Sequence, residues 1–260
     1  METITSKDGT TLAYDRLGAG PPVILVCGGS VDRMSNAGLA QALAPHFTVY
    51  NYDRRGRGDS GDSPQYAVER EIEDIAALAE AAGGTASLYG TSSGAALALE
   101  AAHALPGAIA KLALWEPPYI IEGTRPFPPP NTAQAYRDLV AQGKRGDAVE
   151  YFMLKVVGLP PEFAAFARTQ PWWAGQEAIA HTLAYDAEVM GDYALPAGSA
   201  AELRVPTLVL AGDASFPFII VTAQKLAAII PSAQYQLLPD QQHNVDPAVL
   251  APALVTFFQG

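Results

Sequence analysis

The chain alternates short apolar runs with amphipathic segments, and this pattern predicts strands and helices in turn. Residues 22–27 form a continuous apolar run, as expected of a strand that is buried on both faces. Val68, Ile72, Ile75 and Ala79 instead recur on one helical face, with acidic residues in the first turn. Because strands alternate with helices over most of the chain, we expect a parallel sheet with helices on both faces.

Eight segments have the pattern of strands. They are residues 3–5, 11–14, 22–27, 47–52, 86–89, 109–115, 207–210 and 233–238. The first two flank Asp8-Gly9, which is a hairpin turn signal, so this pair is expected to be antiparallel. The predicted fold class is therefore α/β, with a mostly parallel eight-stranded sheet flanked by helices.

Residues 117–201 interrupt this alternation. The stretch begins with Pro117-Pro118 and contains the proline-rich segment 126–130. Four helical segments follow, near 132–142, 147–157, 161–168 and 173–190. Helices inserted between the sixth and seventh strands predict a helical lid at 117–201, so the core would consist of residues 1–116 and 202–260.

The segment Gly90-Thr91-Ser92-Ser93-Gly94 stands between a predicted strand and a predicted helix. This spacing is typical of a nucleophile elbow, in which glycines permit close backbone contacts and the central residue is held out in a strained conformation. Ser93 is the rival nucleophile, but centring the motif on it would replace both glycines. Ser92 is therefore the predicted nucleophile.

A serine nucleophile needs a base, and the chain has only four histidines. His46 precedes a strand, His103 lies in the helix after Ser92, and His181 lies in a predicted lid helix. His243 follows the last strand, at the sheet edge where Ser92 is expected. His243 is therefore the predicted base.

Taken together, these features resemble the α/β-hydrolase superfamily over nearly the whole chain. The resemblance is carried by the elbow 90–94, the Gly28-Gly29 loop, the run 53–60 and the late histidine His243. It implies a hydrolase that cleaves an ester, lactone or related small acyl substrate through an acyl-enzyme on Ser92. It also implies an oxyanion hole made by the backbone N–H groups of Gly29 and Ser93. Relatives usually have a histidine where this chain has Cys27, which we do not expect to be a nucleophile because it ends a buried strand.

The acid that orients the histidine is missing from its usual place. That place is three residues after the glycine that closes the seventh strand, and here it holds Ser215. Glu116, directly after the sixth strand, is the favoured replacement, with Asp213 and Asp240 as alternatives. Because the usual acid is absent, a non-hydrolytic member of the fold with a ligand-binding, lyase or biosynthetic tailoring role is the second hypothesis.

Composition and sequence motifs bear on the protein's binding partners, its location and its need for a metal or cofactor. The 260 residues suit one α/β unit, and the formal charge of −11 disfavours nucleic acid and anionic membranes as partners. The single cysteine, the absence of a signal pattern and the absence of a membrane-length apolar run favour a cytoplasmic protein. We expect a monomer or a homodimer. No metal-ligand spacing or dinucleotide fingerprint occurs, so we expect no metal and no cofactor.

Two further groups of side chains have open interpretations. Arg54, Arg55 and Arg57 match the superfamily's Asp-x-Arg-Gly-x-Gly-x-Ser turn, so we expect them to brace it, with Arg57 exposed. Five aromatic residues of the predicted lid either line an apolar pocket or anchor the lid on the core. They are Phe163, Phe166, Trp172, Trp173 and Tyr185.

Overall fold

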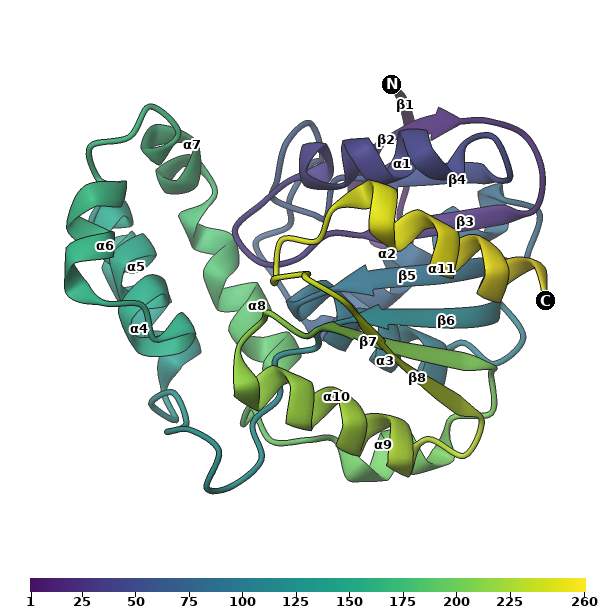
Figure 1. The fold of residues 1–260 in the computed structure, drawn as a ribbon. Helices are drawn as coiled ribbons and strands as arrows, with labels where there is room; N and C mark the ends of the chain where they lie inside the picture. Colours follow the sequence, from purple (N-terminus) through teal and green to yellow (C-terminus); the bar gives the residue numbers. More distant parts are fainter.

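The computed structural model describes all residues, 1–260, and contains one eight-stranded sheet (Figure 1). The strand order is β1-β2-β4-β3-β5-β6-β7-β8, in which β2 is antiparallel to β1 and β4 and every other pair is parallel. The strands are β1 (Glu2–Thr5), β2 (Thr11–Leu17), β3 (Pro22–Val26), β4 (Thr48–Tyr52), β5 (Ala86–Thr91), β6 (Ile109–Trp115), β7 (Thr207–Gly212) and β8 (Ala233–Leu238). The predicted α/β fold class and all eight strands are confirmed.

Helices cover both faces of the sheet because apolar side chains point to both sides of the parallel strands. Helices α1 (Ala37–Leu43), preceded by the 3₁₀ turn η1 (Arg33–Asn36), and α11 (Pro247–Gln259) pack together over one face. Helices α2 (Val68–Ala81), α3 (Ser93–Ala104) and α10 (Pro217–Ile229) cover the other face. These two layers enclose the two main hydrophobic cores.

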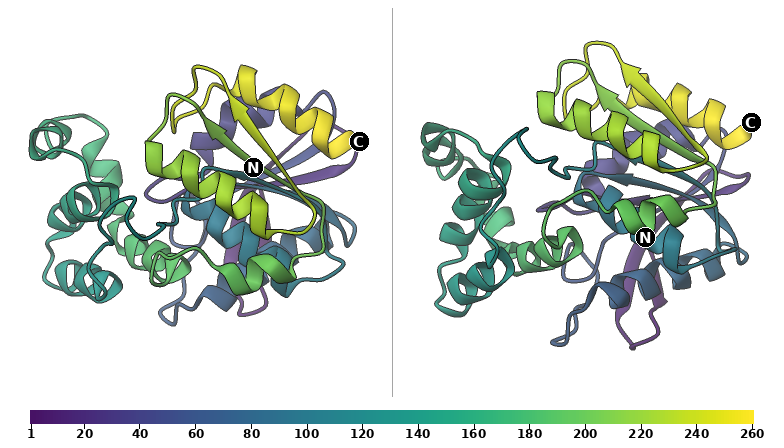
Figure 2. Two further views of the ribbon diagram at one scale, coloured as in Figure 1. Left: turned by 60° about the horizontal axis from the view of Figure 1, so that its bottom comes forward. Right: turned by 90° about the horizontal axis from the view of Figure 1, so that it is seen from below.

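The residues between β6 and β7 fold into helices, most of which lie beyond the arrowheads of the central strands (Figures 1 and 2). They are α4 (Thr132–Ala141), α5 (Arg145–Tyr151), the π-helical turn η2 (Phe152–Val157), α6 (Pro161–Ala167), α7 (Trp173–Ala178), η3 (Ala180–Thr182), α8 (Leu183–Met190) and α9 (Ala197–Glu202). The helices from α4 to α8 share an apolar cluster of their own, whereas α9 packs against α3 and α10. None of the protein's helices has the length and apolarity needed to cross a bilayer.

The turn after β4 carries three arginines, and all three are buried. Arg55 forms ion pairs with Asp74 and Asp8, while Arg54 and Arg57 reach towards helix α8. The expected bracing role fits these pairs, but the expectation that Arg57 is exposed is wrong. Arg57 is buried because it forms an ion pair with Asp186 of α8, a partner that the sequence of the turn does not indicate.

Candidate active site

Ser92 lies at the junction of β5 and α3 with φ 55° and ψ −127°, a conformation that non-glycine residues rarely adopt. The flanking glycines are needed for steric reasons. A Cβ on Gly90 would collide with the Gly94 carbonyl, and a Cβ on Gly94 would collide with the Cys27 carbonyl. The tight packing on both sides of the turn therefore holds Ser92 in its strained conformation at the end of β5.

His243 and Glu116 meet although 127 positions separate them in the chain. Nδ1 of His243 lies 2.6 Å from Oε2 of Glu116, which is fully buried, while the His243 side chain remains 32% exposed. Trp115 Nε1 donates a hydrogen bond of 2.9 Å to the His243 carbonyl and so fixes the loop that carries the imidazole. Of the three acids considered from the sequence, the structure brings Glu116 to the histidine.

Glu116 itself has φ 48° and accepts two more hydrogen bonds. The Gly212 N–H donates to Oε1, and the Ser215 hydroxyl donates to Oε2, each at 2.8 Å. Ser215, at the superfamily's usual acid position, thus supports the carboxylate that the neighbouring strand supplies. The carboxylate is buried with three donors, as a desolvated charge requires.

The alternative acids are placed elsewhere. Asp213 and Asp240 are exposed, and Oδ1 of Asp213 accepts the Asp240 N–H at 2.7 Å. This bond braces the two loops that follow β7 and β8. Neither carboxylate hydrogen-bonds to His243.

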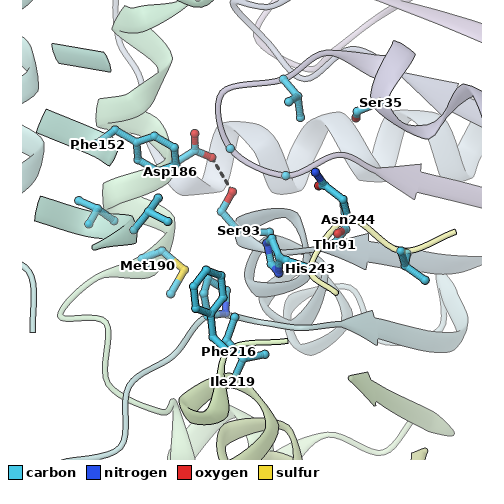
Figure 3. A pocket seen from close by; sticks show the side chains of 18 of the residues that line it. Ser35, Thr91, Ser93, Phe152, Asp186, Met190, Phe216, Ile219, His243 and Asn244 are labelled. Atoms are coloured by element: carbon cyan, nitrogen blue, oxygen red, sulfur yellow. Dashed lines mark hydrogen bonds between the residues drawn. The ribbon is translucent and has the colours of Figure 1, made fainter. Parts of the chain in front are cut away.

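A cavity of about 680 Å³ lies at the sheet edge, where α4, η2, α8 and α10 contribute to walls that are mostly apolar (Figure 3). Ser92 and His243 line this cavity together with Gly28, Gly29 and Ser93. Its volume falls in the range of small-molecule sites. The five aromatic residues singled out in the sequence do not line it, and Trp173 packs instead in the apolar cluster of helices α4 to α8.

The N–H groups of Gly29 and Ser93 make no hydrogen bond to another protein group. Gly28 lies against Ser92, since a Cβ on this glycine would stand 3.1 Å from the Ser92 Cβ. Two unpaired amide donors beside the serine can receive a negatively charged oxygen. The structure therefore brings the two predicted oxyanion-hole residues to the wall of the same cavity as Ser92.

Asp186 is the site residue that the sequence reasoning missed. It extends from α8 to the rear of the cavity, where the Ser93 hydroxyl donates to its Oδ1 at 2.8 Å (Figure 3). Burial raises the pKa of the Asp186 carboxyl, but Arg57 and Arg54 outweigh this effect and hold that pKa below its usual value. The sequence did contain an indication that Asp186 is buried and paired. The buried face of α8 is otherwise apolar, and a single acid on such a face requires a partner.

Other chemistry receives no support from the side chains near the cavity. Burial raises the pKa of the Cys27 thiol, which keeps it protonated and poorly nucleophilic. No group of three or more His, Cys, Asp or Glu side chains has the arrangement of a metal site.

The chain was compared with protein families and with proteins of known sequence or structure. The profile described as "Alpha/beta hydrolase family" matches residues 23–255. An alpha/beta hydrolase from Sphaerobacter thermophilus is 52% identical, with a TM-score of 0.93 over 99% of this chain and 100% of that one. The enol-lactonase from Burkholderia xenovorans has the same fold at 22% identity and a TM-score of 0.73, with 100% of both chains covered.

Among curated sequences, the N-formylmaleamate deformylase of Pseudomonas putida is 32% identical over 154 residues, which is 56% of this chain and 57% of that protein. A hydrolase of Bacillus subtilis, YraK, is 36% identical over 96 residues, which is 35% of both chains, so this chain covers well under two thirds of either relative. The profile match and the Sphaerobacter structure nevertheless both extend over almost the entire chain. The chain therefore belongs to the alpha/beta hydrolase family.

Proposed function

We propose that this protein is a serine hydrolase that cleaves a small ester, lactone or related acyl compound through an acyl-enzyme on Ser92. The observation that carries the proposal is the 2.6 Å contact between His243 Nδ1 and the buried Glu116 carboxylate. A carboxylate at this nitrogen fixes the tautomer whose Nε2 can accept a proton, and it stabilises the imidazolium that forms. The names of the relatives, which include a hydrolase, a deformylase and an enol-lactonase, support hydrolysis at an acyl carbon.

In the proposed reaction, the Ser92 Oγ attacks the acyl carbon while His243 takes the hydroxyl proton. The negative charge that develops on the acyl oxygen is received by the N–H groups of Gly29 and Ser93. His243 then gives its proton to the leaving group, and the acyl-enzyme remains on Ser92. A water molecule, deprotonated by His243, attacks the same carbon, and the acid product leaves as Ser92 regains its proton.

The cavity walls support a small substrate with an apolar portion. Phe152, Leu183 and Tyr193, from the segment between β6 and β7, line the cavity opposite the catalytic loops. In this proposal helices α4 to α8 act as the lid, and their side chains determine which acyl or leaving group fits. The second hypothesis, a non-hydrolytic protein, was motivated by the absence of an acid at the usual position. The contact between Glu116 and His243 supports hydrolysis over that alternative.

The experiment is steady-state hydrolysis of short p-nitrophenyl esters by the parent protein and by Ser92→Ala. We expect turnover by the parent and a loss of activity to the background rate in the variant, with an unchanged melting curve. Equal rates in the two proteins would contradict the proposal. Ser93→Ala tests the rival nucleophile: it removes the neighbouring hydroxyl while its backbone N–H remains, so it should keep measurable turnover, even if part of kcat is lost.

A further inference from the structure

Two peptide groups supply the oxyanion-hole donors of the proposed function. One buried ion pair contacts the carbonyl of the first peptide and the side chain of Ser93, the residue that carries the second N–H. Arg57 Nη1 donates to the Gly28 carbonyl at 2.5 Å and to the Val31 carbonyl at 3.3 Å. The Gly28 carbonyl and the Gly29 N–H belong to the same planar peptide and point in opposite directions. A guanidinium fixed on the carbonyl side therefore fixes the direction of the N–H on the other side.

Asp186 holds Ser93, whose backbone N–H is the second oxyanion-hole donor. Its Oδ1 accepts the Ser93 hydroxyl at 2.8 Å (Figure 3), and its Oδ2 accepts Arg57 Nη2 at 2.8 Å. Gly29 packs directly on this carboxylate, because a Cβ there would lie 3.0 Å from Oδ2. The carboxylate thus contacts Ser93, Gly29 and Arg57 at once.

The cluster is closed off from solvent and its charges balance. Arg54 Nη1 also donates to Asp186 at 2.8 Å, and Arg54 Nε and Nη2 each donate to Glu71 at 2.7 Å. Two arginines and two carboxylates, all buried, make a rigid network that extends from α2 through the turn after β4 to α8. Such networks hold a unique geometry when every charge is paired.

We propose that the Asp186–Arg57 pair is a positioning device that sets the direction of both oxyanion-hole N–H groups. Because Asp186 comes from α8, the helices between β6 and β7 contribute to the geometry of the reaction centre as well as to the cavity wall. The inference rests on the proposed function, in which these two N–H groups receive the developing charge. Asp186 and Arg57 are positioning residues here, since neither touches the reacting atoms.

The test compares Asp186→Asn with Asp74→Asn. Asp74 is an equally buried acid that pairs with Arg55 through two hydrogen bonds of 2.7 and 2.8 Å, away from the cavity. Both variants lose one buried charge opposite an arginine, so both should unfold at a lower temperature. For Asp186→Asn we expect kcat for p-nitrophenyl esters to fall about 10- to 100-fold with little change in KM, because the donors shift but are not removed. Asp74→Asn should retain the parent kcat.

The rate of phosphonylation by a fluorophosphonate should fall in parallel with kcat in Asp186→Asn, because the phosphonyl oxygen enters the same hole. Ser93→Ala, which breaks only the hydroxyl contact, should lose a smaller part of kcat and serves if Asp186→Asn fails to fold. An unchanged kcat per folded molecule in both Asp186→Asn and Ser93→Ala would overturn the inference.

A turnover-independent measurement separates this inference from the proposed function. The backbone amide NMR signals of Gly29 and Ser93 should shift in Asp186→Asn and stay in place in Asp74→Asn. This comparison holds even if the parent hydrolyses no ester, a result that would contradict the proposed function alone. Unshifted signals for both amides would contradict the positioning role.

A second feature of the cavity concerns its charge. Arg125, in the loop after β6, lines the cavity, and no carboxylate forms an ion pair with it. Its guanidinium lies 4.7 Å from the centre of the Phe218 ring and donates to the carbonyls of Val156 and Val157 at 2.9 and 3.2 Å. These contacts place the side chain at the end of η2, but they use two of its five N–H donors and leave its charge unbalanced.

Apart from Arg125 and the imidazole of His243, the acidic or basic side chain in the cavity wall is Asp186, and two arginines neutralise it. Burial lowers the pKa of Arg125, with no acid opposing the effect, whereas neighbouring acids raise the pKa of buried Arg54. From this unbalanced cation we infer that the substrate carries a carboxylate that binds where the half-buried Arg125 lines the cavity. A guanidinium suits this role because its paired N–H groups match the two oxygens of a carboxylate.

The test compares p-nitrophenyl butyrate with mono-(p-nitrophenyl) glutarate, which adds a terminal carboxylate. Arg125→Met keeps the packing on Phe218 and removes the charge, while Arg125→Lys keeps the charge. We expect kcat/KM for the glutarate ester to fall about 10-fold or more in Arg125→Met, with a smaller loss in Arg125→Lys and little change for the butyrate ester. Equal losses for both esters would refute the inference.

Binding of monomethyl glutarate to Ser92→Ala, measured by calorimetry with and without Arg125→Met, gives the same answer without turnover. A weaker affinity in the double variant supports the subsite even if no ester is hydrolysed. Equal affinities in the two proteins would refute it.

Discussion

Replacing Glu116 by glutamine keeps the shape of the side chain and changes its hydrogen-bonding pattern in a way that can be worked out. The carboxylate accepts from His243 Nδ1, the Ser215 hydroxyl and the Gly212 N–H. A glutamine has one acceptor oxygen and one donor NH₂, so it cannot serve both the Gly212 side and the His243 side. One of the two contacts must change.

If the amide oxygen faces Gly212, the NH₂ faces His243 and holds Nδ1 without its proton. The proton then stands on Nε2, which can no longer take the Ser92 proton. If the oxygen faces His243 instead, the NH₂ opposes the buried Gly212 N–H, at a cost of about 1–3 kcal/mol. The unproductive arrangement is therefore favoured by roughly 5- to 150-fold, and the productive one lacks the charge that stabilises the imidazolium.

We expect kcat for a short p-nitrophenyl ester to fall by about 10² to 10⁴ in Glu116→Gln, which corresponds to about 2.7–5.4 kcal/mol of barrier. Circular dichroism and thermal melting check that the variant is folded. The matched control is Asp213→Asn, an exposed acid whose loss should change kcat by less than about threefold. An active Glu116→Gln enzyme together with an inactive Asp213→Asn enzyme would refute the reasoning.

Three further predictions concern the surroundings of the site. Ser215→Ala removes one of three donors to the carboxylate and should lower kcat about tenfold or less, measured with the same ester; a loss as large as that of Glu116→Gln would contradict a supporting role. Native Cys27 should resist iodoacetamide at pH 8 because burial raises its pKa, and it should react once guanidinium unfolds the chain; rapid labelling of the native protein would contradict this. Arg55 lowers the pKa of Asp8 in the folded state, so the stability from this pair is present above the unfolded pKa and is lost as pH falls through the folded one. Asp8→Asn should therefore flatten the decline of the melting temperature below about pH 4, and a decline as steep as that of the parent would count against the pair.

The strands and most of the helices could be predicted because their signals are local. The helical segment expected over 173–190 is instead divided into α7, η3 and α8, and α9 was not predicted. The run 22–27 and the glycines around Ser92 show their burial and packing in their own sequence, and β3 and the elbow lie where these patterns place them. Glu116 could be proposed because it follows a strand whose carboxyl end lies at the same edge as Ser92. The strained φ of 48° at Glu116 and its hydrogen bond from Ser215 could not be predicted from the sequence, because both depend on how β6 and β7 pair.

The ion pair between Arg57 and Asp186 could not be predicted from local sequence patterns, because it also depends on how distant segments pack. Arg57 looked like a solvent-exposed turn residue, yet its partner Asp186 comes from a helix 129 positions away. Only the packing of α8 against the turn after β4 makes that contact. The lone acid on an apolar helix face was a signal for a buried partner, although it did not identify Arg57.

The most direct test of the account is to identify the atom that forms the covalent adduct. The parent protein is treated with a fluorophosphonate, and the modified peptide is mapped by mass spectrometry. We expect one adduct per chain, on Ser92, and none in Ser92→Ala. An adduct on Ser93 or Cys27, or hydrolysis that persists in the fully labelled protein, would contradict a covalent mechanism at Ser92.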